Sequence, residues 1–310
     1  MRIAVTGGCG FIGSHVVDDL IAAGHEVLVV DTHQRWTNPG ASYLIGDIFD
    51  APPLAAAVEG RDAVFHLAAV SDVSEVRADP VEAVRLNVEG TARVLDAARR
   101  GGCARFILAS TVWVYGATAG GGGGERTEDA LVDLSRTGHL YVSTKLAAEM
   151  LTRSYLAMYG QQFTILRYGI PYGPRMREAL VIARFVREAN EGRPITIAGT
   201  GDQQRNFVYV EDLARAHVLA LAPAAVNQTL ALEGDTPVSV TEIAEAVQHL
   251  VRDVPVTYIP GREADYEGLT ISNRLAKELL GWQPVVPLAD GIRRYLTWLR
   301  LNQAQPVINS

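Results

Sequence analysis

The chain has 310 residues, 48% of them hydrophobic and 20% charged, which excludes a disordered chain, a collagen and a coiled coil and fits one or two globular domains. Its 28 lysines and arginines against 35 acidic residues give a net charge of −7, which argues against a broad basic surface for nucleic acid. Because it has only two cysteines, no apolar run long enough to span a membrane and no secretory signal, we expect a cytoplasmic protein that binds neither nucleic acid nor membranes.

Short β-branched runs alternate with longer helical patterns through the first half of the chain. The predicted strands are Ile3–Thr6, Glu26–Val30, Tyr43–Ile45, Ala63–His66, Arg105–Ala109 and Thr164–Leu166. The predicted helices are Phe11–Ala23, Val81–Arg100 and Tyr141–Tyr159. This alternation predicts βαβ units with right-handed crossovers, and therefore an α/β fold with a doubly wound parallel sheet of the Rossmann type.

The pattern changes after about Arg167. Prolines become frequent, helices mix with isolated short strands, and the last predicted helix, Leu288–Leu301, is amphipathic. We therefore predict two parts: a dinucleotide-binding domain at residues 1–168 and a smaller C-terminal α/β lobe for the substrate at residues 169–310.

A glycine-rich segment joins the first predicted strand to the first predicted helix. Gly7, Gly10 and Gly13 stand in it at G-x-x-G-x-x-G spacing. Glycines at such a junction permit a tight turn and a close approach of the backbone to a pyrophosphate, and the helix N-terminus adds N–H groups and a positive dipole end. A plain glycine turn is the alternative, but the strand–helix junction favours a dinucleotide-binding loop.

Two aspartates follow the next two strands. Asp31 ends the second strand, eighteen residues after Gly13, where a carboxylate can bind the ribose 2′-hydroxyl of NAD. The same carboxylate would repel a 2′-phosphate, so NAD is predicted rather than NADP. Asp47, at the end of the third strand, is placed to reach the adenine amino group, and a simple turn aspartate is the open alternative.

Tyr141 and Lys145 lie four residues apart at the start of a predicted helix, and so on one helix face. A free tyrosine titrates near pH ~10. A nearby ammonium and a positively charged nicotinamide ring would lower this pKa, so that Tyr141 could remove a proton from a sugar hydroxyl. Lys145 would also bind the nicotinamide ribose. The spacing is common by chance, and the dinucleotide loop is what favours the catalytic interpretation.

Ser110 and Thr111 follow the strand Arg105–Ala109, at the edge of the sheet where open α/β folds bind ligands. A hydroxyl at this position can bind the same substrate oxygen as Tyr141. The alternative is an ordinary threonine at the end of a strand.

Together these residues resemble the extended short-chain dehydrogenase/reductases, specifically their NAD-dependent sugar epimerase/dehydratase group, whose members include UDP-glucose 4-epimerases. The resemblance covers essentially the whole chain and includes Thr6–Gly13, His66–Ala69, Val114–Gly116 and the Tyr141–Lys145 pair. It implies further cofactor contacts at Phe11, Ile12, Ile48, Leu67, Ala68, Ala69, Asn87 and Tyr168.

The resemblance also implies how the second lobe binds a nucleotide diphosphate sugar. Arg205 matches an arginine that binds the diphosphate, and Arg262 with Asp265 matches a pair that binds phosphate and the nucleotide ribose. Tyr172, in a Tyr-Gly-Pro segment, is a further implied substrate contact. Taken singly, the two arginines are more often solvated surface residues, but their order along the chain favours binding.

The two positions after Thr111 separate the activities of this group. Dehydratases carry Asp-Glu there and decarboxylases a Glu, whereas Val112 and Trp113 cannot transfer protons in this role. Trp113 is expected to lie near C5 and C6 of the sugar and to limit that substituent, and a packing aromatic is the alternative. Ile170 replaces the usual asparagine, which leaves the sugar contact open.

The resemblance therefore implies an NAD-dependent nucleotide-sugar epimerase acting at C4, with Thr111, Tyr141 and Lys145 catalytic and no metal. The alternatives are a nucleotide-sugar 4-ketoreductase, a 4,6-dehydratase and a dinucleotide sensor without chemistry. A homodimer through Val81–Arg100 and the helix of Tyr141 is also implied.

Overall fold

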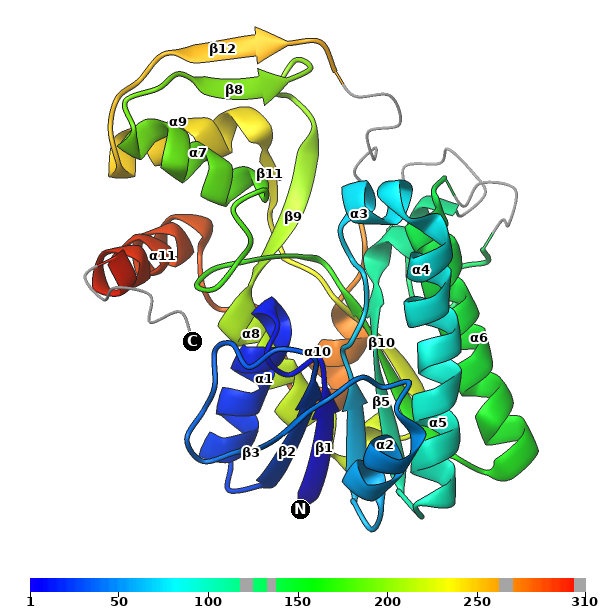
Figure 1. Cartoon of the computed structure of the whole chain (residues 1–310). Helices are drawn as coiled ribbons and strands as arrows, with labels where there is room; N and C mark the ends of the chain where they lie inside the picture. The colour runs from blue at the N-terminus through cyan, green and yellow to red at the C-terminus, as the bar shows by residue number, and fades with distance from the viewer. Residues whose placement is uncertain (118–124, 133–137, 262–269, 304–310) are drawn as a thin grey trace.

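The computed structural model describes residues 1–117, 125–132, 138–261 and 270–303 (Figure 1). Its larger part is a seven-stranded parallel sheet with the order β10-β6-β5-β4-β1-β2-β3, which confirms the predicted doubly wound fold. The strands are β1 (Arg2–Thr6), β2 (Glu26–Asp31), β3 (Ser42–Ile45), β4 (Ala63–His66), β5 (Arg105–Thr111), β6 (Gln162–Tyr168) and β10 (Gln228–Leu232).

Helices cover both faces of this sheet, because side chains of each strand alternate between the faces. One face carries α1 (Phe11–Ala22) and α8 (Val210–Leu219), and the other carries α2 (Ala51–Val58), α5 (Thr91–Arg100) and α6 (Leu140–Tyr159). In β1, for example, Ile3 and Val5 belong to the core under α1 and α8, while Ala4 belongs to the core under α2 and α5.

The predicted helix Val81–Arg100 is divided in the structure. After α3 (Val73–Ala78), α4 (Pro80–Val84) leads into a π-helical turn, η1 (Arg85–Gly90), and then into α5. A π-helical turn holds one extra residue and is frequent at functional sites. The spacing of apolar residues through this turn is close to that of an α-helix. The sequence pattern alone therefore predicts one continuous helix.

The second part of the molecule lies beyond the carboxyl ends of the large sheet (Figure 1). It contains a three-stranded sheet of β11 (Pro237–Ser239), β9 (Gln204–Tyr209) and β7 (Ile170–Tyr172), and a two-stranded sheet of β12 (Val256–Ile259) and β8 (Ile195–Ala198). Its helices are α7 (Val181–Asn190), α9 (Val240–Leu250) and α11 (Leu288–Gln303), which form a separate apolar core with these strands.

The chain crosses between the two parts more than once. Strand β10 pairs with β6, and α8 packs against α1, although both elements follow residue 168. A short turn, η4 (Pro223–Ala225), precedes β10, and α10 (Arg274–Leu280) returns to the large sheet beside it. The predicted division at residue 168 stays a prediction. None of the helices in the described ranges is long and apolar enough to cross a lipid bilayer.

Candidate active site

The segment between β1 and α1 folds into a cradle that only glycine can form. Gly7 has a φ of +75°, and a Cβ built on it would lie 2.6 Å from the backbone nitrogen of Ala68. A Cβ on Gly13 would lie 2.1 Å from the Gly7 carbonyl oxygen. Gly10 begins α1 without a capping side chain, so the first-turn N–H groups of the helix face the loop. The cradle and the helix N-terminus together suit a pyrophosphate.

Asp31 lies beside this cradle at the carboxyl end of β2. Its Oδ2 accepts a hydrogen bond from the Cys9 backbone N–H (2.9 Å), and its Oδ1 accepts one from the His33 N–H (3.2 Å). The carboxylate is thus fixed next to the glycine loop, as an adenosine ribose would require. Asp47 instead accepts from the Phe49 N–H (3.1 Å), an arrangement typical of a turn aspartate.

The segment after β4 lies against the glycine loop. The Leu67 N–H donates to the Thr6 carbonyl (3.0 Å), and Ala68 is the residue that Gly7 approaches. His66 is held between Thr6 Oγ1 (2.7 Å) and Thr91 Oγ1 (3.1 Å). Burial lowers the pKa of His66 to about 3, so this histidine is a neutral structural residue.

Asn87 connects the segment after β4 to α6. Its Oδ1 accepts from the Val70 N–H (2.8 Å), and its Nδ2 donates to the Val70 carbonyl (2.9 Å) and to Thr144 Oγ1 (3.1 Å). Thr144 in turn donates to the Tyr141 carbonyl (2.8 Å). Both amide hydrogens of Asn87 are therefore used within the protein, which makes it a positioning residue for α6. Its predicted contact with the cofactor stays a prediction.

Tyr141 and Lys145 lie together in the first turns of α6. The Lys145 Nζ is 6.0 Å from the centre of the Tyr141 ring and donates a hydrogen bond to the Ala109 carbonyl (3.0 Å). Burial lowers the pKa of Lys145 to about 8, although the nearby carboxylate of Glu149 opposes this change. The lysine is thus buried against the strand β5 and still carries its charge at neutral pH.

The pKa of Tyr141 is set mainly by its burial. Burial raises it to about 12, while the charge of Arg177 and a hydrogen bond with Thr111 act to lower it. In the protein without a nicotinamide ring, desolvation of the phenolate therefore outweighs the charges around it, and the lowering predicted for Lys145 together with bound nicotinamide stays a prediction. Thr111 therefore lies close to Tyr141, and the prediction that both bind the same substrate oxygen stays a prediction.

Ser110 and Thr111 are the last two residues of β5, so this strand is two residues longer than predicted. Because neighbouring strand residues point in opposite directions, they serve different sites. Ser110 Oγ donates to Glu149 Oε1 (2.5 Å), and Glu149 forms a buried double hydrogen bond with Arg167 (Nη2–Oε2, 2.7 Å). This network lies behind the site. The sequence analysis missed Glu149, although its spacing of four residues from Lys145 places both on one helix face.

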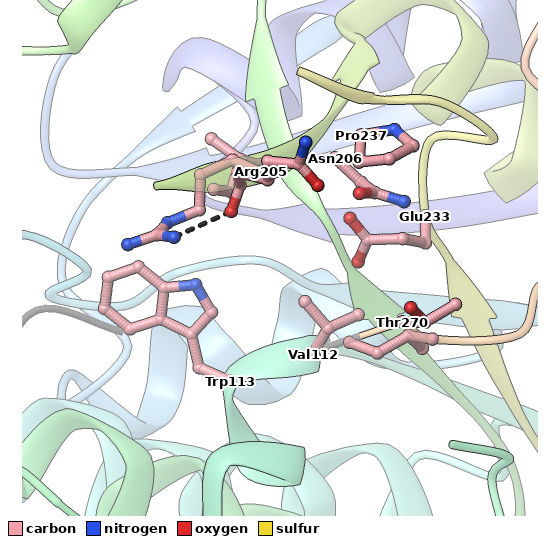
Figure 2. Close-up of a pocket in the computed structure, with 10 residues that line it drawn as sticks. Val112, Trp113, Arg205, Asn206, Glu233, Pro237 and Thr270 are labelled. Carbon is pink, nitrogen blue, oxygen red and sulfur yellow. Dashed lines mark hydrogen bonds between the residues drawn. The ribbon is translucent and has the colours of Figure 1, made fainter. Parts of the chain in front are cut away.

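A pocket of about 80 Å³ opens between the carboxyl end of β5 and the second part of the molecule (Figure 2). It is lined by Val112, Trp113, Ile170, Gln204, Arg205, Asn206, Glu233, Pro237, Thr270 and Ile271. Val112 and Trp113 begin the 3-10 turn η2 (Val112–Ala117) directly after Thr111. The Trp113 ring meets the ring of Tyr141 edge-on at 6.3 Å, so the pocket adjoins the Tyr141 site.

The predicted substrate residues divide into three groups. Trp113 and Arg205 line the pocket. Tyr172 does not, because it is buried in the second core with its hydroxyl directed to the Pro287 carbonyl (3.4 Å). Arg262 and Asp265 lie outside the described residues. A predicted cofactor residue, Tyr168, likewise directs its hydroxyl into the protein, where it contacts His217 Nε2 (2.5 Å).

Glu233 is a pocket residue that the sequence analysis missed. Glu233 is the residue directly after β10, and it is only 3% exposed. Its Oε2 is buried without a hydrogen-bond partner among the described residues. Burial raises the pKa of Glu233 well above its ordinary value. Its neighbours Gly234 and Asp235 give no signal of this burial, since a Glu-Gly-Asp run is typical of exposed turns.

A protein-family profile, known sequences and solved structures that resemble this chain all indicate the same family. The profile of the "NAD dependent epimerase/dehydratase family" matches residues 3–230. A UDP-glucuronate 4-epimerase of Thermodesulfobacterium geofontis is 30% identical over 96% of both chains, and UDP-glucuronic acid decarboxylase 1 of Xenopus tropicalis is 30% identical over 96% of this chain and 72% of its own. The crystal structure of a UDP-glucose 4-epimerase from Thermotoga maritima with UDP-glucose has a TM-score of 0.89 at 30% identity, covering 98% of this chain and all of that one.

Proposed function

The chain belongs to the NAD-dependent epimerase/dehydratase family, and from this premise we propose that it epimerises a nucleotide diphosphate sugar at C4 through a transient 4-keto sugar. The observation that supports the proposal is the arrangement at the end of β5. Thr111 and Tyr141 lie together beside Lys145, and the next two residues, Val112 and Trp113, are apolar or aromatic side chains that line the adjoining pocket.

Enzymes of this family act on nucleotide sugars and depend on NAD, in agreement with the predicted cofactor. The residues present fit this group: the glycine cradle with the N-terminus of α1 would hold its pyrophosphate, and Asp31 a ribose. When bound, NAD supplies a hydride acceptor and donor for the sugar carbon.

The protein's own residues handle the proton and orient the sugar. Tyr141 takes the proton of the C4 hydroxyl as that carbon is oxidised and gives it back when the carbon is reduced from its other face. Thr111 binds the C4 oxygen through its hydroxyl. Lys145, held by the Ala109 carbonyl, lies beside the ring of Tyr141, and its positive charge would add to that of a bound nicotinamide ring in stabilising the phenolate.

The apolar pair after Thr111 favours epimerisation over the other activities in the family. Removal of water from the sugar needs an additional acid and base near C5 and C6. Val112 is 2% exposed and has no ionisable group, and Trp113 can donate only its indole N–H. An epimerase needs only the tyrosine, the hydroxyl at Thr111 and the reversible hydride transfer. A 4-ketoreductase with the same three residues is the second candidate, and it would consume reduced cofactor.

Two further features of the proposal concern the ligand and the assembly. Arg205, which lines the pocket, binds the diphosphate, in line with the UDP-glucose held by the Thermotoga maritima structure. The chain forms a homodimer in the cytoplasm through the faces of α4, η1, α5 and α6. In these elements Val81 is 77%, Val84 41% and Met150 63% exposed, and exposed apolar side chains of this kind support an interaction surface.

The test is chromatography with mass spectrometry on a panel of nucleotide sugars incubated without added cofactor. We expect a new isomer of unchanged mass, because NAD held by the protein is regenerated in each cycle. Loss of water or of carbon dioxide would contradict epimerisation and assign a dehydratase or a decarboxylase. A product that forms only with added NADH or NADPH, and gains two hydrogens, would assign the ketoreductase. No turnover of any sugar would favour a sensor.

A further inference from the structure

Glu233 and Arg205 are the only ionisable side chains among the ten described residues that line the pocket. They are separated across it: in Figure 2 the Arg205 guanidinium extends toward one side, while the Glu233 carboxyl group lies on the other, above Val112. The pocket therefore has a cationic side and an acidic side. A ligand with an anionic diphosphate at the Arg205 side places its other end, the sugar, toward Glu233.

The protein is built around the Glu233 carboxyl group. A Cβ on Gly169 would lie 2.9 Å from Glu233 Oε1, so glycine at this position leaves the space that the carboxyl group fills. The Asn273 amide donates to the Glu233 carbonyl (3.0 Å), and the Asn206 amide donates to the Gly234 carbonyl (2.7 Å). These two bonds fix the backbone on both sides of the Glu233 side chain, while no described residue forms a hydrogen bond with its Oε2.

A buried carboxyl group in such a position favours a hydroxyl ligand over a second carboxylate. Burial raises the pKa of Glu233 well above its ordinary value and so favours the protonated form, which can donate one hydrogen bond to a sugar hydroxyl and accept another from it. A carboxylate on the sugar would need a cation or several donors when buried. Glu233 offers it one donor, and two carboxyl groups that share a site cannot both ionise.

We propose that Glu233 is the specificity-determining residue of this pocket, which selects a nucleotide-linked sugar that presents hydroxyl groups to it and rejects one that carries a carboxylate. The inference rests on the proposed function, because it takes the pocket to be the sugar site. It assigns neutral hexoses as the substrate class and excludes hexuronic acids. The proposal concerns a binding role, and Glu233 takes part in no proton transfer of the proposed reaction.

The test compares UDP-glucose with UDP-glucuronate in the wild-type chain and in Glu233→Gln. We expect the wild type to prefer UDP-glucose in kcat/KM, and this preference to fall by about tenfold or more in Glu233→Gln, mainly through a lower KM for UDP-glucuronate. The glutamine has nearly the same shape but offers two N–H donors and no carboxyl group. Glu188→Gln is the matched control: Glu188, on α7, is also buried and accepts a hydrogen bond from the Thr196 N–H (3.1 Å) of β8, and its replacement is expected to leave the preference unchanged.

Calorimetric titration of the same two ligands separates this inference from the proposed function. If neither sugar is isomerised but the wild type binds UDP-glucose more tightly and Glu233→Gln loses that preference, the proposed function fails and the role of Glu233 stands. If a sugar is isomerised and the preference is the same in both proteins, the role of Glu233 is overturned and the function stands. A wild type that prefers UDP-glucuronate, or binds neither ligand, also overturns it.

Discussion

Tyr141 and Lys145 both have pKa values shifted toward their neutral forms. Burial raises the pKa of Tyr141 to about 12 and lowers that of Lys145 to about 8. The hydroxyl of Tyr141 is therefore protonated at neutral pH in the protein alone, and its use as a base depends on positive charge that is brought to the site. Lys145, fixed by the Ala109 carbonyl 6.0 Å from the ring centre, is already present, so the additional charge would be that of a bound nicotinamide ring.

Tyr141→Phe removes the proton acceptor and leaves the ring in place. We expect turnover to fall by about a hundredfold or more, since a positioned acid–base group contributes about that much. The variant should keep its bound NAD, because the cradle of Gly7 and Gly13 is unchanged. Steady-state assays and chromatography of the cofactor released on denaturation measure the two properties. Tyr159→Phe, at the exposed end of the same helix, is the control, and near-normal turnover of Tyr141→Phe would contradict the mechanism.

The glycine loop shows how far the sequence defines an element of the site. The spacing of Gly7, Gly10 and Gly13 predicted a close backbone approach, and the structure has it, with Gly7 packed on Ala68. The strands of the parallel sheet up to β6 were also predictable, because each is a short β-branched run between helical patterns. Strand β10 was not predicted. It follows a long stretch without alternation, and it pairs with β6 from across the second part of the chain.

Gly13→Ala tests the loop as an element. The added Cβ would lie 2.1 Å from the Gly7 carbonyl oxygen, so the loop must move out of the shape that suits a pyrophosphate. We expect the affinity for the cofactor to fall at least about tenfold. A loss of about 1.4 kcal/mol, close to the contribution of one hydrogen bond, corresponds to this factor. Fluorescence titration with NAD measures it. Gly261→Ala, whose methyl group meets only an ordinary contact at 3.6 Å, should bind NAD normally, and equal affinities in the two variants would argue against the cradle.

The pocket itself could not be predicted from local sequence. Its lining comes from six separate places: η2 directly after β5, β7, β9, the residue after β10, the start of β11 and residues 270–271. The resemblance found Trp113 and Arg205 because they lie in recognisable segments. It did not find Glu233, because a buried glutamate in a Glu-Gly-Asp run can be recognised only from its three-dimensional surroundings. For the same reason the burial of the Tyr172 hydroxyl was not foreseen.

His217 joins α8 to strand β6 of the large sheet and makes the stability of the protein depend on pH. Its Nδ1–H donates to the Leu213 carbonyl (2.9 Å) on α8, and its Nε2 accepts from the Tyr168 hydroxyl (2.5 Å) on β6. Burial lowers the pKa of His217 to about 4. Between that pH and about 6.5 the unfolded chain binds a proton that the folded chain does not. The stability that neutral His217 contributes is therefore present above about 6.5 and is lost as the pH falls toward 4.

His217→Gln removes this titration. The free energy of unfolding of the wild type should exceed that of the variant at pH 7, and the difference should shrink by about 3 kcal/mol at pH 4. Urea unfolding of both proteins at the two pH values measures the difference. A difference that is the same at both pH values would show that the imidazole does not titrate in this range.

The exposed apolar residues of α4 and α6 predict that the protein assembles into a dimer. Light scattering at micromolar concentration should give the mass of a dimer for the wild type and of a monomer for the double variant Val84→Glu, Met150→Glu. Charges placed in an apolar interface lose their hydration without gaining partners. Leu301→Glu replaces an equally exposed apolar residue on α11 and should remain dimeric. A wild-type monomer would remove the proposed interface.

The proposed activity requires that the C4 hydrogen leaves the sugar and returns to it within one catalytic cycle. The most direct measurement uses a nucleotide hexose labelled with deuterium at C4, incubated with the wild-type protein in ordinary water. We predict an isomer that keeps the label at C4, detected by mass spectrometry and NMR. An isomer that has lost the label to solvent would show that the hydrogen leaves C4 as a proton, and would contradict hydride transfer at this site.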